Sequence, residues 1–257
     1  MARSMFGVDL RRALLYGDRY GRRQGTRLWI ESSLRDHVSV PGLKQPLYLR
    51  PDTTDLHVFE EIFLKGQYDL PFSLDPRFIV DGGAYIGISS LFFALRFPGA
   101  TIVAVEPDPE NLEFLRRNVA AYPNIRPVNA GIWGKGGVKL TVANPDAPKW
   151  GLRTLPSDSG GLESLSIAQI MKDAGADRID ILKLDIEGAE SSVFADDHCC
   201  DWLARTDVLV VELHDRWYPG TAKAFYSALQ PYQFRQYLRG ETVIIEKADP
   251  PLPWNVR

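Results

Sequence analysis

The chain has 257 residues, of which 45% are hydrophobic and 25% are charged, and this composition can bury one substantial core. Its formal net charge of −3 at pH 7 lacks the basic excess typical of proteins that bind nucleic acid, so no nucleic-acid partner is expected. No apolar run approaches the length that spans a membrane, and no apolar signal core follows the N-terminal arginines. We therefore expect a cytoplasmic protein with one main domain and an appendage.

The first 75 residues are predicted to form a cap or lid, and residues 76–257 to form the main domain. The elements predicted in this cap are a short helix around Leu10 to Tyr16, short strands near 38–40 and 47–49, and an amphipathic helix after Asp52-Thr53-Thr54-Asp55. That second helix has two possible roles. It closes the ligand end of a sheet, or it covers a sheet edge by packing alone.

A glycine-rich turn organises the main domain. The apolar run Phe78 to Val80 is followed by Asp81, Gly82 and Gly83, and then by Gly87 at the start of a helical pattern. The next strand, 101–105, ends in Glu106, about twenty positions after the glycines, where an acid accepts hydrogen bonds from two ribose hydroxyls. These residues predict a nucleoside site.

The spacing of the turn distinguishes between two nucleoside cofactors. The order Asp-Gly-Gly-x-x-x-Gly from Asp81 to Gly87 differs from the dinucleotide fingerprint G-x-G-x-x-G. An acid directly before the glycines repels a pyrophosphate, but it suits a ligand with an ammonium group and a sulfonium centre. The turn therefore favours S-adenosylmethionine, and an NAD-dependent oxidoreductase is the weaker alternative.

Strands and helices continue to alternate after the turn, which predicts a doubly wound α/β fold with a mostly parallel, seven-stranded sheet. The expected elements are a helix at 111–119, a third strand at 125–132, an extra strand at 138–142, a long loop at 144–161, a helix from Ser166 to Ala174, strands at 179–186 and 208–213, and a C-terminal hairpin at 234–246. The hairpin is expected to close the sheet with an antiparallel edge.

Ligands of open α/β sheets bind beyond the carboxyl ends of the strands. Asp81, Glu106, Asn129, Asp185 and His214 all follow predicted strands and are expected at that edge. Methyl transfer to an oxygen requires an aligned nucleophile and removal of its proton. The candidate catalytic residues are Asp185, Glu187, Lys183 and His214.

Each of these candidates also has a structural interpretation. Asp185 is a base or a ligand of the acceptor hydroxyl, or it caps the helix that follows Gly188; Glu187 is favoured by a helix dipole in any case. Lys183, in an apolar strand, is most simply the ion-pair partner of a neighbouring acid. His214 is a proton acceptor or a structural histidine. As a further alternative, the acids share a divalent metal such as Mg²⁺, although no motif of fixed spacing supports one.

Several segments match one known family in order. They are Arg50-x-x-Thr-Thr-Asp55, Val80-Asp-Gly-Gly-Ala-Tyr-Ile-Gly87, Val105-Glu-Pro-Asp-Pro109, Asp180-Ile-Leu-Lys-Leu-Asp-Ile-Glu-Gly-Ala-Glu190 and Val211-Glu-Leu-His214. With these segments the chain resembles the FkbM family of S-adenosylmethionine-dependent methyltransferases. The resemblance implies a class I, Rossmann-like methyltransferase fold and O-methylation of a sugar or natural-product hydroxyl.

The resemblance also implies site residues. Asp81, Gly83, Gly87 and Glu106 would bind the cofactor, and Asp185 and Glu187 would line the reacting centre. The complete set expected around the cofactor is Thr54, Tyr68, Asp81, Gly82, Gly83, Ala84, Tyr85, Gly87, Glu106, Pro107, Asn129 and Asp185. Gly82 stands where the family more often has a β-branched or small residue, which predicts a looser turn.

The sequence thus predicts an O-methyltransferase for a saccharide or polyketide-like alcohol. A non-catalytic S-adenosylmethionine-binding protein is an alternative, and so is a methyltransferase for another small molecule or a nucleic acid. A nucleic-acid N-methyltransferase would carry an Asn/Asp-Pro-Pro-aromatic block where this chain has Asp185-Ile-Glu-Gly188. The sequence leaves the oligomeric state open and is compatible with a homo-oligomer.

Overall fold

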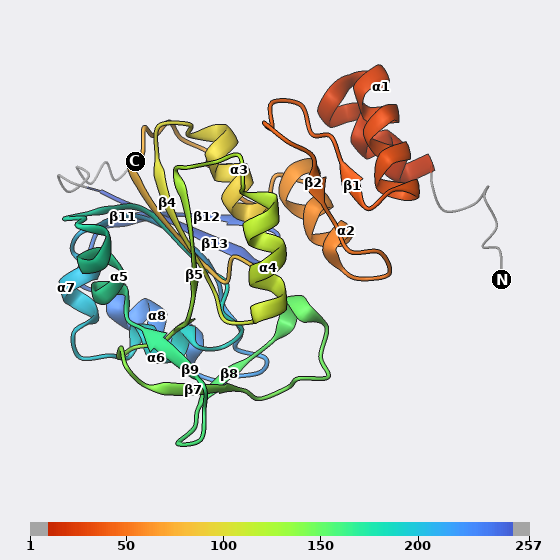
Figure 1. The fold of residues 1–257 in the computed structure, drawn as a ribbon. Helices are drawn as coiled ribbons and strands as arrows, with labels where there is room; N and C mark the ends of the chain where they lie inside the picture. The colour runs from red at the N-terminus through yellow and green to blue at the C-terminus, as the bar shows by residue number, and fades with distance from the viewer. Residues whose placement is uncertain (1–9, 249–257) are drawn as a thin grey trace.

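The computed structural model describes residues 10–248, so the proline-rich tail at 250–253 lies outside the described residues. A seven-stranded sheet forms the centre, with helices on both faces and the N-terminal segment packed beside α3 and α4 (Figure 1). Among residues 10–248, no helix has both the length and the apolar character needed to cross a membrane.

The order of the strands confirms the expected α/β fold class. The central sheet has the order β12-β13-β11-β10-β3-β4-β5. Its strands are β3 (Phe78–Gly82), β4 (Thr101–Glu106), β5 (Ile125–Asn129), β10 (Ile179–Leu184), β11 (Thr206–Glu212), β12 (Phe234–Arg239) and β13 (Thr242–Lys247). From β3 the chain adds strands outward on one side, and it then returns to place β10 on the other side, parallel to β3. Such a switch point between β3 and β10 is where α/β sheets bind ligands.

The C-terminal hairpin closes one side of the sheet, as predicted. β13 is antiparallel to both neighbours and lies between β11 and β12, so β12 forms the edge of the sheet. The reason is burial: Val243, Ile244 and Ile245 of β13 are buried, whereas most residues of β12 are exposed and suit an edge strand. The predicted C-terminal hairpin with an antiparallel edge is therefore confirmed.

Helices cover the two faces of the sheet in separate hydrophobic clusters. They are α3 (Ile88–Arg96), α4 (Pro109–Asn118), α5 (Ile167–Ala174), α6 (Glu190–Phe194), α7 (Cys199–Leu203) and α8 (Thr221–Leu229). Ile79 and Ile181 pack with the α3 and α4 side, whereas Val80 and Leu182 pack with α5 to α8. Successive residues of a strand thus point to opposite faces of the sheet, and helices cover both faces.

The N-terminal segment is more helical than predicted. Its elements are α1 (Leu10–Leu34), β1 (His37–Val38), β2 (Leu47–Tyr48), α2 (Asp55–Phe59) and a π-helical turn, η1 (Glu60–Leu64). A break at Gly21, where φ is 76°, divides α1 into two parts. Phe59 and Phe63 join the same core as Phe92 and Phe93 of α3, so the segment packs against the main domain. A domain boundary near residue 75 stays a prediction.

A second, smaller sheet corrects two further predictions. The expected strand 125–132 divides at Ala130 into β5 and β6 (Gly131–Ile132). β6 belongs to a sheet of order β6-β9-β7-β8 with β7 (Lys139–Val142), β8 (Thr154–Pro156) and β9 (Leu162–Leu165). The predicted long loop at 144–161 therefore contains β8 and a short 3₁₀ helix, η2 (Lys149–Gly151).

Candidate active site

A cavity of about 660 Å³ opens at the carboxyl ends of β3, β4, β10 and β11. Its floor includes the glycine turn, Glu106 and Asp185, and its upper walls come from α2, η1, the 149–152 segment and the β12–β13 turn. The N-terminal segment therefore lines the cavity in addition to packing on the sheet.

The turn after β3 admits only glycine at one position. Gly83 has a φ of 73°, and a Cβ atom built on it would lie 1.8 Å from the carbonyl oxygen of Asp185. Its N–H donates to the carbonyl of Val105 at 3.0 Å. The turn is thus held between β4 and the end of β10, where backbone can approach a ligand closely.

Gly82 contradicts the expectation of a looser turn. A Cβ atom at this position would lie 2.6 Å from Ile132 Cδ1 and 2.9 Å from Leu184 Cδ2. Neighbouring side chains fill the space that a larger residue would occupy. Because Gly82 has no side chain, these neighbours can pack closely against the turn.

Asp81 lies behind the turn and not in the cavity wall. Its side chain is fully buried, and its Oδ2 accepts hydrogen bonds from Ser89 Oγ at 2.7 Å and Ser90 Oγ at 2.6 Å. Its Oδ1 lies 3.3 Å from Lys183 Nζ, so the expected ion pair of Lys183 with a neighbouring acid is confirmed. Lys183 also donates to the carbonyls of Gly82 and Gly83, at 3.1 and 2.7 Å.

Glu106 ends β4 as predicted and faces the cavity in a fixed orientation. Its Oε2 accepts from the Tyr85 N–H at 2.8 Å, and its Oε1 accepts from Asp108 N–H and Asn111 Nδ2 at 3.1 Å each. Burial raises the pKa of Glu106 to about 7, although these hydrogen bonds act in the opposite direction.

A buried network connects Glu106 to the N-terminal segment. The Arg50 guanidinium makes two hydrogen bonds of 3.0 Å with the Asp55 carboxylate and donates to Asn111 Oδ1 at 2.9 Å. Asp55 also accepts a hydrogen bond from the Tyr85 hydroxyl. Arg50, Asp55 and Asn111 were not expected as site residues, although two of them begin and end the first matching segment, Arg50-x-x-Thr-Thr-Asp55.

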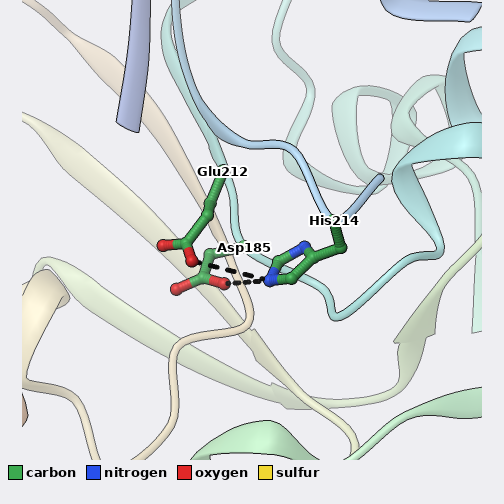
Figure 2. A group of neighbouring side chains, drawn as sticks. All are labelled: Asp185, Glu212 and His214. Atoms are coloured by element: carbon green, nitrogen blue, oxygen red, sulfur yellow. Dashed lines mark ion pairs between the residues drawn. The ribbon is translucent and has the colours of Figure 1, made fainter. Parts of the chain in front are cut away.

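At the other end of the cavity, carboxylates surround His214. Figure 2 shows the Asp185 and Glu212 carboxylates directed at the ring, with Nε2 3.8 Å from Asp185 Oδ1 and 3.7 Å from Glu212 Oε1. Glu187 Oε2 lies 3.6 Å from the same nitrogen. On the other side of the ring, Nδ1 and Glu190 Oε1 form a hydrogen bond of 3.0 Å.

The cluster changes the protonation of its members. Burial disfavours the His214 imidazolium, but the hydrogen bond and charge of Glu190, with the charges of Asp185 and Glu187, raise the pKa of His214 to about 9. Burial, together with the Asp185 charge, raises the pKa of Glu187 to about 7 and that of Glu212 to about 8.

The structure settles which acid supports the turn after β10. Glu190, fully buried, accepts hydrogen bonds from the Ile186 N–H at 2.9 Å and the Gly188 N–H at 2.8 Å. Among the described residues, no hydrogen bond from this turn reaches the Asp185 side chain, which is 29% exposed and lines the cavity. Asp185 is therefore not the helix cap.

The cavity brings together most of the expected site residues. Those in its wall are Thr54, Tyr68, Gly83, Ala84, Tyr85, Glu106, Pro107, Lys183, Asp185 and Glu187. Asp81, Gly82, Gly87, Asn129 and His214 do not line it. Asn129 donates from its side chain to the carbonyls of Glu106 and Pro107 at 3.0 and 3.1 Å, so it supports the end of β4.

Glu190 and Glu212 were missed as site residues. A signal for Glu212 was present, since Glu212 and His214 are two positions apart at a strand end, where alternate residues face the same side. Glu190 ends the fourth matching segment, but its contact with His214 was not visible because the two residues are 24 positions apart in sequence.

The family model described as "Methyltransferase FkbM domain" matches residues 81–241. The chain is 29% identical over 171 residues to methyltransferase sdnD of Sordaria araneosa, covering 53% of this chain and 66% of that protein. It is 30% identical over 185 residues to methyltransferase 1 of Beauveria bassiana, covering 62% and 73%. It is 28% identical over 170 residues to the 31-O-demethyl-FK506 methyltransferase FkbM of Streptomyces tacrolimicus, covering 53% and 65%. The chain thus spans slightly less than two thirds of the first and third of these relatives.

Solved structures of low sequence identity also align with the chain. Fibrillarin of Aeropyrum pernix with bound S-adenosyl-L-methionine aligns at 13% identity and a TM-score of 0.43, covering 74% of each chain. An O-methyltransferase of Bacillus cereus with bound SAH aligns at 12% identity and a TM-score of 0.42, covering 67% of this chain and 74% of that one. At these scores the alignments do not bear on the function of this chain.

Proposed function

The chain belongs to the FkbM methyltransferase family, and from that membership we propose that it transfers a methyl group from S-adenosyl-L-methionine to a hydroxyl of a sugar or natural product. One observation carries the proposal. Glu106 and the Asp185–His214 end of the cavity lie on either side of the glycine turn, and both Glu106 and Asp185 face the same cavity. One end suits a ribose and the other suits a reacting hydroxyl.

The donor is proposed to lie across the end of β3. Glu106 ends β4 and Asp185 follows β10, and both strands pair with β3, so strand spacing separates the two positions by about 10 Å. Glu106 accepts the ribose hydroxyls, and the turn from Gly83 to Tyr85 presents backbone to the rest of the donor.

The acceptor hydroxyl is proposed to lie at Asp185. In the reaction the acceptor oxygen forms a bond to the methyl carbon, the bond from that carbon to sulfur breaks, and S-adenosylhomocysteine leaves. The hydroxyl proton must be removed as the oxygen attacks. Asp185 faces the cavity, whereas the side chain of His214 is only 3% exposed behind it, so Asp185 is the group that meets the hydroxyl.

The acceptor is proposed to be recognised at the cavity mouth. Trp150, Arg216 and Leu238 line that region and combine aromatic, cationic and aliphatic surface. An alcohol with both a polar and an apolar face fits this lining. One relative is named for methylating an oxygen of FK506, and that precedent supports an oxygen acceptor.

Donor binding and methyl transfer test the proposal. S-adenosylmethionine and S-adenosylhomocysteine should each raise the melting temperature, because a ligand at a hundredfold its Kd stabilises the fold by about 2.7 kcal/mol. NADH serves as the control and should have no effect. Methyl transfer is then sought by mass spectrometry with a panel of glycosides and macrolide alcohols. The absence of a thermal shift with both sulfur ligands at millimolar concentration would refute the proposal.

A further inference from the structure

The Asp185–Glu212–His214 cluster has the geometry of a cation site. One ligand atom from each residue lies within 4.8 Å of the other two. Asp185 follows β10 and Glu212 ends the neighbouring strand β11, so the two carboxylates converge on the imidazole, as Figure 2 shows. Two carboxylate oxygens and one imidazole nitrogen form a donor set that divalent cations such as Mn²⁺ accept.

The histidine is oriented as a metal-binding histidine is. Glu190 is fully buried and holds Nδ1 of His214 at 3.0 Å. When Nδ1–H donates to that carboxylate and a cation displaces the Nε2 proton, the Nε2 lone pair faces Asp185 and Glu212. A carboxylate behind the imidazole fixes the tautomer and raises the basicity of the ligand nitrogen in metal sites.

Glu187 gives an independent indication of a missing cation. Glu187 is 7% exposed, and its carboxylate receives no hydrogen bond from the described residues. Its closest basic partner is His214 Nε2 at 3.6 Å, beyond hydrogen-bonding distance. A buried carboxylate without a hydrogen bond is costly unless a positive charge lies nearby.

The excess of acidic side chains around His214 also favours a bound cation. Asp185, Glu187, Glu190 and Glu212 all approach the single imidazole of His214 within 4 Å. Lys183 lies 4.0 Å from Asp185 Oδ2, but its ammonium already binds Asp81 and two backbone carbonyls. The charge of Arg216 also acts on Glu187 and lowers its pKa. The four acids still outnumber the positive charges of His214 and Arg216.

We propose that Asp185, Glu212 and His214 bind one divalent cation at the acceptor end of the cavity. Asp185 and Glu212 line the cavity, so the remaining coordination positions face the space where the acceptor lies. The role of the cation rests on the proposed function: it binds the acceptor oxygen, lowers the pKa of that hydroxyl and orients it toward the methyl group. The hydroxyl proton passes to cavity water, and the cation undergoes no redox change.

Manganese binding to the full chain tests the site directly. The protein is stripped with EDTA, desalted and titrated with Mn²⁺, and binding is followed by calorimetry and by the electron paramagnetic resonance of free Mn²⁺. We expect one Mn²⁺ per chain, with affinity at least tenfold weaker in Glu212→Gln. Glu113→Gln changes an exposed carboxylate of α4, outside the cavity, and should bind Mn²⁺ like the unmodified chain.

The outcomes separate the cation site from the methyl-transfer proposal. No Mn²⁺ binding by the unmodified chain, or equal binding by Glu212→Gln, overturns the cation site. Circular dichroism and thermal unfolding without ligand verify that Glu212→Gln is folded, and Asp185→Asn serves as a second variant if it is not. A confirmed acceptor methylated at full rate in EDTA also overturns the cation site while leaving the methyl-transfer proposal intact. Mn²⁺ binding without any binding of S-adenosylmethionine supports the site and refutes the methyl-transfer proposal.

Discussion

Lys183 and Asp81 are paired twice, as register partners on β10 and β3 and as an ion pair with Nζ 3.3 Å from Oδ1. Their side chains are 2% and 0% exposed, so the two charges are removed from water together. The same ammonium donates to the carbonyls of Gly82 and Gly83. The pair therefore holds the glycine turn against the end of β10, which is the floor of the candidate active site.

The first prediction concerns this pair. Lys183→Met leaves the Asp81 carboxylate buried without a cation, and breaking a buried pair in this way costs about 3–5 kcal/mol of unfolding free energy. Adding Asp81→Asn should recover much of that loss, because the neutral amide still bonds Ser89 and Ser90. Urea unfolding of the two variants measures both values. A double variant as unstable as Lys183→Met alone would contradict this account.

The second prediction concerns Gly83. Gly83→Ala should destabilise the fold strongly and weaken donor binding, because its Cβ would overlap the carbonyl of Asp185 at a φ of 73°. Gly17→Ala is the matched control, since Gly17 lies in α1 with no atom within 4 Å of an added Cβ. Alanine there should stabilise the helix by up to about 1 kcal/mol. Melting temperatures compare the two, and a normal Gly83→Ala protein would disprove the constraint.

The third prediction concerns donor affinity. Glu106→Ala should weaken S-adenosylmethionine binding at least tenfold, because charge-assisted hydrogen bonds contribute about 1.5–3 kcal/mol each. Glu113→Ala is the control. Glu113 is exposed on α4, the helix that follows Glu106, and its replacement should leave the affinity unchanged. Calorimetry supplies both dissociation constants. Unchanged affinity in Glu106→Ala would reassign Glu106 to a purely structural role at the end of β4.

The fourth prediction is the pH dependence of donor binding. The pKa of Glu106 is raised from 4.5 to about 7, so its contribution to stability is complete below about pH 4.5 and is lost as the pH rises through 7. Ribose hydroxyls donate to the ionised form, so binding favours the opposite state. Affinity for S-adenosylmethionine should therefore increase between about pH 6 and about pH 8. Calorimetry across this range should show a larger increase in the unmodified chain than in Glu106→Gln, where only Glu187 and Glu212 still titrate in the cavity.

The fifth prediction separates chemistry from binding at Asp185. Asp185→Asn should keep donor affinity within a few-fold and lower turnover of a confirmed acceptor by ~10²–10⁴. The change is nearly isosteric, and Glu190 supports the adjacent turn, so the fold should survive. His214→Ala is compared in the same assay. If both variants turn over normally, neither residue handles the acceptor, and a larger loss in His214→Ala transfers the leading role to the histidine.

The sequence alone determined the local chemistry of the site. Glycines at 83 and 87 after a short apolar run specify a strand, a tight turn and a helix, because few other residues tolerate the positive φ found at these positions. An acid at the end of the next strand placed Glu106 in the cavity wall correctly. These features depend on residues near one another in the chain, so local patterns were sufficient.

The tertiary structure decided which elements become neighbours. Only the tertiary structure showed that β13 pairs with β11 and that β12 forms the edge of the sheet. Only the alignment of β10 beside β11 brought Glu212 to Asp185, and only the fold behind the turn removed Asp81 from the cavity. Strand order and side-chain burial arise from contacts between distant segments, and hydrophobic packing of the whole sheet sets them. Periodicity within one segment does not contain that information.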